Sequence, residues 1–196
     1  MTTLNKEDLL LKEINCIKNE KYRENLKIIV NLLPDYFFLV AASSTGKYHP
    51  KFSLGKGGLL RHSKAAFKIG YELLNNNTIG YSFKADEKDL MLFALLVHDG
   101  LKHGKEYSEW TVFDHPIQMS KFIEENKDKL TLTDSERKFI EQCIETHMGE
   151  WTIDYKGNEV LEKPSNKYQR FVHMCDFLAS RKFLDFTFKD NEIVEN

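Results

Sequence analysis

Apolar residues recur every three or four positions along most of the chain, a pattern that predicts amphipathic helices. Residues 42–58, rich in serine and glycine, and residues 148–166 lack this period and are predicted to be loops. The tail 187–196 is only weakly patterned. The pattern therefore predicts one all-α domain. Its helices are expected within residues 5–39, with a break around 18–22 and an end at Pro34, and over 59–77, 84–102, 115–128, 133–147 and 167–184.

Two of these helices carry recognisable end signals. Asp86 is a candidate N-cap for the 84–102 helix, and Gly100 marks its end. Thr133 and Glu136 have the spacing of a capping box, in which each side chain binds a backbone N–H near the start of the helix.

The composition is that of an ordinary globular protein, with 41% hydrophobic and 30% charged residues in a chain of 196. The formal net charge of −2 gives no overall electrostatic case for nucleic-acid binding, although a local basic groove is compatible with it. No signal peptide or membrane-spanning run is apparent in the sequence. Three cysteines without a CxxC spacing fit a reducing compartment, so we expect a cytoplasmic protein without a membrane partner.

Several ionisable residues occupy positions where an apolar side chain is expected. A lone histidine in such a place is more often a hydrogen-bonded core residue than a metal ligand. Burying several such groups separately would be very unfavourable. Convergence on divalent metal ions removes the penalty, because ligation requires neutral imidazoles and ionised carboxylates. The residues on, or at the end of, an apolar stripe are His62, His98, Asp99, His147 and Asp176.

The order of these five residues, with His115 between Asp99 and His147, resembles the HD superfamily of metal-dependent phosphohydrolases in its binuclear version. The closest motif context is the HD domain of YhaM-type 3′-5′ exoribonucleases. The segments that carry the resemblance are HPKFSLGKGGLLRHS before and around His62, LLVHDGLK, THMGEW and VHMCDFLASR.

The resemblance covers residues 38–182 and implies the organisation of the chain. Residues 1–37 would be N-terminal helices packed on the core, 38–186 the HD domain, and 187–196 a tail. YhaM-type enzymes carry an OB-type nucleic-acid-binding module before the HD domain, whereas a helical N-terminal segment cannot form that barrel. Gly100 also precedes the hydrophobic residue of the motif instead of following it. We therefore do not expect processive RNA degradation, but the hydrolytic centre is less affected.

The resemblance also implies the roles of the site residues. A first ion would be bound by His62, His98, Asp99 and Asp176, and a second by His115 and His147, with Asp99 bridging the two. Mixed His/Asp ligation suits Mn, Fe, Ni, Co or Zn better than Mg, so two divalent transition-metal ions are the expected cofactors. Two such ions can activate a water for in-line attack on phosphorus. Lys102, one turn beyond Asp99, would stabilise the phosphate or that water, or else lie at a solvated helix end.

Residues in and beside the 42–58 loop are candidates for binding the substrate. His49, Lys56 and Arg61 could contact a phosphate, and Lys47 adds positive charge; the same residues would also serve solubility. His49 has the alternative of a surface loop histidine.

Other polar and aromatic residues are weaker candidates. His173 is one turn before Asp176 and either faces the site or packs beside it. Asp114 either orients His115 or is merely polar, and His103 is expected to be exposed. Four aromatic side chains either stack on a base or contribute to packing: Tyr107, Trp110, Trp151 and Tyr155.

We therefore expect an enzyme, an HD-type phosphohydrolase whose substrate is a small-molecule nucleotide or a short nucleic-acid end. The alternative is an HD-fold diiron oxygenase that acts on a small polyol or phosphonate, because it uses the same order of ligands. The basic loop and the GGLLRHS context favour hydrolysis. A binding domain without activity is disfavoured, because every ligand position is filled.

Overall fold

The elements of the chain are taken from a computed structural model that describes residues 5–43, 46, 49–184, 187–189 and 192–194. The α-helices are α1 Lys6–Ile14, α2 Glu20–Leu32, α3 Gly58–Asn75, α4 Ala85–Val97, α5 His115–Glu125, α6 Asp134–Glu145 and α7 Lys167–Ala179. Short 3-10 helices are η1 Asp35–Phe38, η2 Lys51–Ser53, η3 Gly80–Ser82, η4 Lys127–Lys129 and η5 Lys182–Leu184. The strands β1 Thr187–Lys189 and β2 Glu192–Val194 form an antiparallel hairpin.

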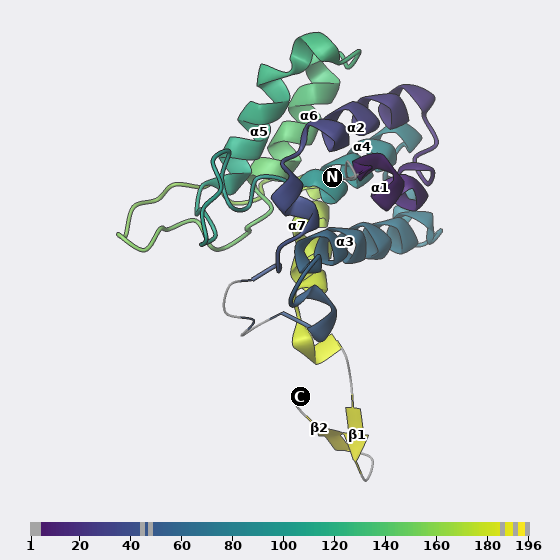
Figure 1. Cartoon of the computed structure of the whole chain (residues 1–196). Helices are drawn as coiled ribbons and strands as arrows, with labels where there is room; N and C mark the ends of the chain where they lie inside the picture. Colours follow the sequence, from purple (N-terminus) through teal and green to yellow (C-terminus); the bar gives the residue numbers. More distant parts are fainter. Residues whose placement is uncertain (1–4, 44–45, 47–48, 185–186, 190–191, 195–196) are drawn as a thin grey trace.

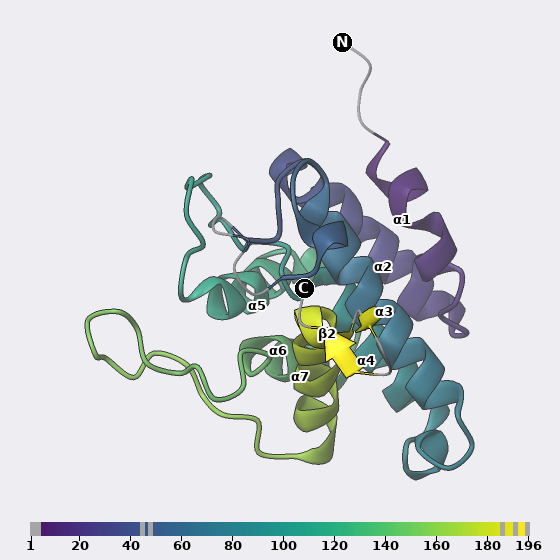
Figure 2. The same ribbon diagram turned by 90° about the horizontal axis from the view of Figure 1, so that it is seen from below.

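Helix α4 lies at the centre of the bundle. Every residue from 89 to 97 is buried, as expected for a helix that is apolar on all sides. Helices α2, α3, α6 and α7 pack against it (Figures 1 and 2). Because α4 is enclosed on all sides, the residues that directly follow its last turn are delivered to the interior of the protein.

The N-terminal helices belong to the same core as the rest of the bundle. Leu10 and Ile14 of α1 and Leu26 of α2 are fully buried in it. Asp89 of α4 binds the turn between α1 and α2, since its Oδ2 accepts hydrogen bonds from the backbone N–H groups at positions 18 and 19, at 3.0 and 2.8 Å. This carboxylate supplies partners to N–H groups that no helix satisfies.

The predicted all-α architecture is confirmed, with small differences at the helix ends. Helix α4 begins at Ala85, so Asp86 lies in its first turn and is not its N-cap. The capping box of Thr133 and Glu136 is present as predicted. Helix α7 ends at Ala179, earlier than its pattern indicated. None of the helices in the described ranges is long and apolar enough to cross a membrane.

Charged side chains follow the edge shared by α5 and α6. Arg137 donates hydrogen bonds to Glu124 Oε2 at 2.5 Å and to Asp134 Oδ1 at 3.0 Å. Glu141 Oε1 lies 3.5 Å from Arg137 Nε, but this buried oxygen accepts no hydrogen bond from any described residue. Burial raises the pKa of Glu141 to about 7, although the positive charge of Arg137 acts in the opposite direction. The fold therefore favours the neutral carboxyl group at this position.

This shift predicts a dependence of stability on pH. Between pH 4.5 and about pH 7 the folded chain binds more protons at Glu141 than the unfolded chain. The stabilisation is therefore complete below pH 4.5 and is lost as the pH rises to about 7. We predict that Glu141→Gln and the wild type have the same free energy of unfolding in urea at a pH below 4.5. At a pH above 7 the variant should be more stable by roughly 1–3 kcal/mol.

The matched control is Glu162→Gln, because Glu162 is exposed and its substitution should leave both free energies unchanged. A variant that is less stable than the wild type at both pH values would contradict the prediction. That outcome would mean that the ion pair with Arg137 outweighs the burial of the carboxylate.

Candidate metal centre

The ends of several helices bring the predicted ligands into one buried cluster. His62 lies in α3 and Asp176 in α7, whereas the other ligands lie where helices begin or end. His98 and Asp99 follow α4, His115 begins α5, and His147 follows α6. Within the described residues, three overlapping groups have ligand atoms close enough to share a metal ion: His62, His98 and Asp99; His98, His147 and Asp176; and Asp99, His115 and His147.

Three of the imidazoles are held by the same local hydrogen bond. In each, Nδ1 lies 2.7 Å from the carbonyl oxygen three residues earlier, the pairs being His98 with Leu95, His115 with Val112, and His147 with Ile144. A carbonyl can only accept, so each Nδ1 carries the hydrogen. In the neutral ring Nε2 is then left with a lone pair, which is the atom a metal ion would bind.

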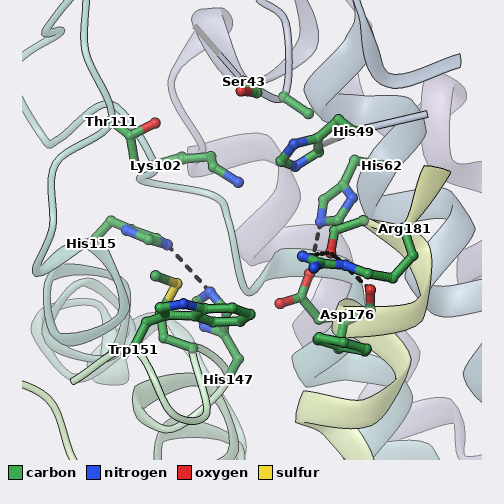
Figure 3. Close-up of a pocket in the computed structure, with 14 residues that line it drawn as sticks. Ser43, His49, His62, Lys102, Thr111, His115, His147, Trp151, Asp176 and Arg181 are labelled. Carbon is green, nitrogen blue, oxygen red and sulfur yellow. Dashed lines mark hydrogen bonds and ion pairs between the residues drawn. The ribbon is translucent and has the colours of Figure 1, made fainter. Parts of the chain in front are cut away.

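One side of the cluster places two such lone pairs face to face. The Nε2 atoms of His115 and His147 are 3.2 Å apart (Figure 3). Asp99 Oδ1 lies 3.1 Å from the first and 3.6 Å from the second. Two lone pairs and a carboxylate oxygen repel one another at these distances. A cation in their midst would convert that repulsion into attraction.

The other side of the cluster uses the second oxygen of the same carboxylate. Asp99 Oδ2 lies 3.6 Å from His62 Nε2 and 3.5 Å from His98 Nε2. Asp176 Oδ1 lies 2.8 Å and 3.3 Å from the same two nitrogen atoms. Asp99 thus faces two sets of imidazoles with different oxygen atoms, although its side chain is only 1% exposed.

The charges of the cluster suit metal ligation. Burial acts to raise the pKa of Asp99, but the charges of Lys102 and His98 overcome it and hold this pKa well below its usual range. The pKa of Asp176 is also held well below its usual range, because His98 and His62 outweigh the effect of burial. Burial lowers the pKa of His62 and of His115. Ionised carboxylates and neutral imidazoles are the forms that bind metal ions.

Two buried atoms of the cluster lack the hydrogen bonds that burial normally demands. His98 Nε2 and Asp99 Oδ1 have no hydrogen-bond partner among the described residues. Leaving such atoms unpaired is costly in a protein interior. Burial acts to lower the pKa of His98, but the nearby Asp99 and Asp176 carboxylates outweigh it and raise this pKa above its usual value. The surroundings of this ring therefore favour a positive charge. The donor set therefore fits a divalent transition-metal ion.

A cavity of about 490 Å³ opens beside the cluster (Figure 3). Four of the six ligands, His62, His115, His147 and Asp176, contribute to its wall. The other lining residues are Ala42, Ser43, His49, Lys102, Thr111, Met148, Trp151, Phe177, Ser180 and Arg181. A molecule bound in this cavity would contact both the cluster and a wall of cationic and aromatic side chains.

Lys102 and His49 both line the cavity, as candidates for contact with the substrate. Lys102 Nζ donates a 2.6 Å hydrogen bond to Asp99 Oδ2. The ring of His49 packs edge-to-face on His62, with centroids 5.6 Å apart. Burial, together with the charge of Lys102, lowers the pKa of His49 to about 4. At neutral pH this imidazole can therefore offer a hydrogen bond to a phosphate, but not a positive charge.

The other two residues predicted to bind the substrate, Lys56 and Arg61, lie away from the cavity. The Arg61 guanidinium donates to the carbonyl groups of Phe52, Leu54 and Lys56. These bonds hold the loop in place and use three of the five N–H donors of the guanidinium. Lys56 is exposed, and neither it nor Arg61 lines the cavity. The structure therefore gives no support to the predicted contacts of Lys56 and Arg61 with substrate, and Lys47 lies outside the described residues.

Three weaker candidates are also placed outside the cluster. Asp114 Oδ1 accepts a hydrogen bond from Gln118, one turn into α5. His103 was expected to be exposed, but this is wrong: it is only 4% exposed, and its ring stacks on Tyr107. The third candidate, His173, contacts the backbone of a predicted ligand.

His173 holds the segment that carries His147. Its Nδ1 donates a 2.7 Å hydrogen bond to the carbonyl of His147. Gly149, two residues further on, has a φ of +67°, and a Cβ atom there would lie 2.1 Å from the His173 ring. Only glycine leaves room for that ring, so the contact between Gly149 and His173 fixes how the chain turns away from α6.

Sequence reasoning missed part of the cavity wall, notably Phe177, Ser180 and Arg181. The available signal was their position in and just after α7, since Phe177 follows Asp176 directly and Ser180 comes one turn later. Comparison with known proteins adds no further guide. No family model, curated protein or solved structure that was searched matches the chain. The function must therefore be inferred from the cluster and its cavity.

Removal of one ligand should weaken metal binding. We predict that wild-type protein stripped with a chelator binds Mn²⁺ or Co²⁺ in isothermal titration calorimetry. His115→Ala and His147→Ala should bind more weakly by at least the roughly 10- to 100-fold that loss of a supporting partner costs. Asp114→Asn is the control, because this carboxylate is adjacent to His115 but outside the cluster. Equal affinities in all four proteins would contradict the assignment.

A second prediction concerns the support of His147. Gly149→Ala should weaken metal binding and lower the melting temperature, because its methyl group would displace His173. Gly157→Ala is a matched control, since Gly157 has a φ of +86° but nothing within 4 Å of the added Cβ. Both variants incur the roughly 1–2 kcal/mol cost of a left-handed alanine. If the two bind metal equally well, His173 does not position His147.

Proposed function

We propose that the chain is an HD-type metal-dependent phosphohydrolase that cleaves a phosphoester of a small phosphorylated molecule, with nucleotides as the expected class. The observation that carries this proposal is the position of Asp99, whose two oxygens face two sets of imidazoles in a buried cluster. The order of the ligands along the chain, which resembles that of the HD superfamily, supports the same conclusion.

The six clustered residues would hold divalent transition-metal ions, with His115 and His147 on one side and His62, His98 and Asp176 on the other. Such ions, when bound, lower the pKa of a coordinated water and neutralise charge on phosphoryl oxygens. Asp99 would contribute to both sides and hold them at a fixed separation. Its ionisation, favoured by the positive charge of Lys102 against the effect of burial, is what makes this possible.

The cavity wall favours an anionic substrate. Lys102 reaches the cavity while its Nζ remains hydrogen-bonded to Asp99, so its ammonium group is fixed between the cluster and the substrate. Arg181 contributes a second cation to the same wall. These two cations support phosphate chemistry over the oxygenase alternative, whose polyol substrates carry no charge, although phosphonates would satisfy them as well.

The loops that border the cavity favour a small substrate over a polymer. Residues 103–114, which supply Thr111, contain one lysine and three acidic residues. Residues 148–164, which supply Met148 and Trp151, contain two lysines and four acidic residues. Both loops extend from the bundle on the same side (Figure 1). A polyanion would be repelled by them, because nucleic-acid affinity depends on phosphate neutralisation by basic side chains.

The proposal is tested by phosphate release in the presence of added metal. Wild-type protein with Mn²⁺, Ni²⁺ or Co²⁺ should hydrolyse p-nitrophenyl phosphate or nucleoside monophosphates. Asp99→Asn should lower kcat/KM by at least about a thousandfold, because several kcal/mol of transition-state stabilisation would be lost. Asp128→Asn, an exposed carboxylate in η4, is the control and should retain full activity.

Two results would overturn the proposal. One is that the protein binds these metals but releases no phosphate with any of the three. The other is oxygen consumption with Fe²⁺ and a polyol or phosphonate without hydrolysis, which would favour the oxygenase.

A further inference from the structure

Part of the cavity wall is aromatic and lies apart from the metal ligands. The rings of Trp151 and Phe177 are nearly parallel, with an interplanar angle of 16° and centroids 6.2 Å apart. Trp151 is 42% exposed even though both rings line the cavity. A large indole that is left this open toward a cavity offers a flat surface to whatever binds there.

A cation completes this surface. The guanidinium carbon of Arg181 lies 4.3 Å from the Phe177 ring centre and 5.7 Å from that of Trp151. Its Nε and one terminal nitrogen donate to Ser180 Oγ at 3.0 and 2.8 Å. No carboxylate within the described ranges forms an ion pair with Arg181. Its charge is therefore held in place and remains available to a ligand.

The aromatic surface is anchored by the same segments that carry the cluster. Phe177 follows Asp176 in α7, and Trp151 comes four residues after His147. The residue after Trp151 is fixed, because the carbonyl of Thr152 accepts hydrogen bonds from the N–H groups of Val160 and Leu161, at 2.8 and 3.2 Å. The surface is thus formed before any ligand arrives and stands at a set distance from the cluster.

We propose that Trp151, Phe177 and Arg181 form a platform that binds the planar ring of a substrate whose phosphate faces the cluster. This inference rests on the proposed function and narrows it to nucleoside phosphates as opposed to sugar phosphates. The cavity of about 490 Å³ is within the usual size range of small-ligand pockets. Stacking tolerates any base, because every base presents a π-face. The platform would therefore select for the presence of a base and not for its identity.

Binding can be measured apart from catalysis. The sequence contains two tryptophans, so Trp110→Phe leaves Trp151 as the only tryptophan, whose fluorescence can be excited selectively. In this variant, kept in a chelator so that no hydrolysis occurs, adenosine 5′-monophosphate should quench the fluorescence and ribose 5-phosphate should not. By calorimetry the nucleotide should bind at least about fivefold more tightly than the sugar phosphate, the least expected for one stacked base.

Substitutions then assign the effect to the platform. Trp151→Ala should abolish the preference for the nucleotide, and Trp151→Phe should restore part of it. In the metal-loaded enzyme Trp151→Ala should raise KM for nucleotides more than for ribose 5-phosphate. Tyr155→Ala is the matched control, because Tyr155 lies in the same loop, is 88% exposed and does not line the cavity. Melting curves will verify that each variant is folded.

The outcomes separate this inference from the proposed function. If the wild type hydrolyses nucleotide and sugar phosphate with equal KM, and Trp151→Ala leaves both KM values unchanged, the platform is overturned but the phosphohydrolase is not. Quenching by nucleotides in a protein that hydrolyses no phosphoester would support the platform and overturn the proposed reaction. Equal affinity for both ligands in the chelated wild type and in Trp151→Ala would likewise overturn the platform.

Discussion

The burial of one ionised carboxylate, Asp99, constrains the rest of the structure. Helix α4 is apolar on every side and passes through the middle of the bundle, so the residue that follows its end must lie in the interior. A carboxylate there is tolerable only if positive charge and hydrogen-bond donors surround it. Lys102 provides one such charge at 2.6 Å, and the four histidines around Asp99 provide the sites for others. Helix α4 can therefore end beside a buried carboxylate only because the other residues of the cluster surround it.

The sequence predicted most of this cluster because burial and periodicity are linked, whereas His115 was predicted only from the resemblance in the order of the ligands. His62 lies on the apolar stripe of α3, and the structure finds it 1% exposed. The helices themselves follow from the same period, since most of their stabilisation comes from packing an apolar face. The hydrogen bonds that orient three of the imidazoles are local. Each of these histidines binds the carbonyl group three residues earlier, an arrangement that is available wherever a helix begins or ends.

What the sequence did not reveal depends on contacts that leave no periodic pattern. His103 is buried because Tyr36 and Tyr107 enclose its ring, and no local pattern encodes that contact. Arg61 is predicted to contact a phosphate, yet three of its donors bind carbonyl groups of the loop that precedes its helix. Loop carbonyls have no periodic signature, so their demand for hydrogen bonds is invisible in a sequence.

Helix α7 contributes one residue to the cluster and the next residue to the aromatic surface, and so links these two parts of the cavity. Asp176 is turned toward the cluster, and the ring of its neighbour Phe177 packs against Trp151 and Arg181. Because adjacent residues on a helix are separated by a fixed rotation and rise, the backbone of α7 holds Asp176 and Phe177 at a set spacing. The loop after α6 repeats this coupling, since it carries His147 and then Trp151. A ligand that reaches both surfaces must therefore match this spacing, and under the proposed function such positioning would hold its phosphate in place for the reaction.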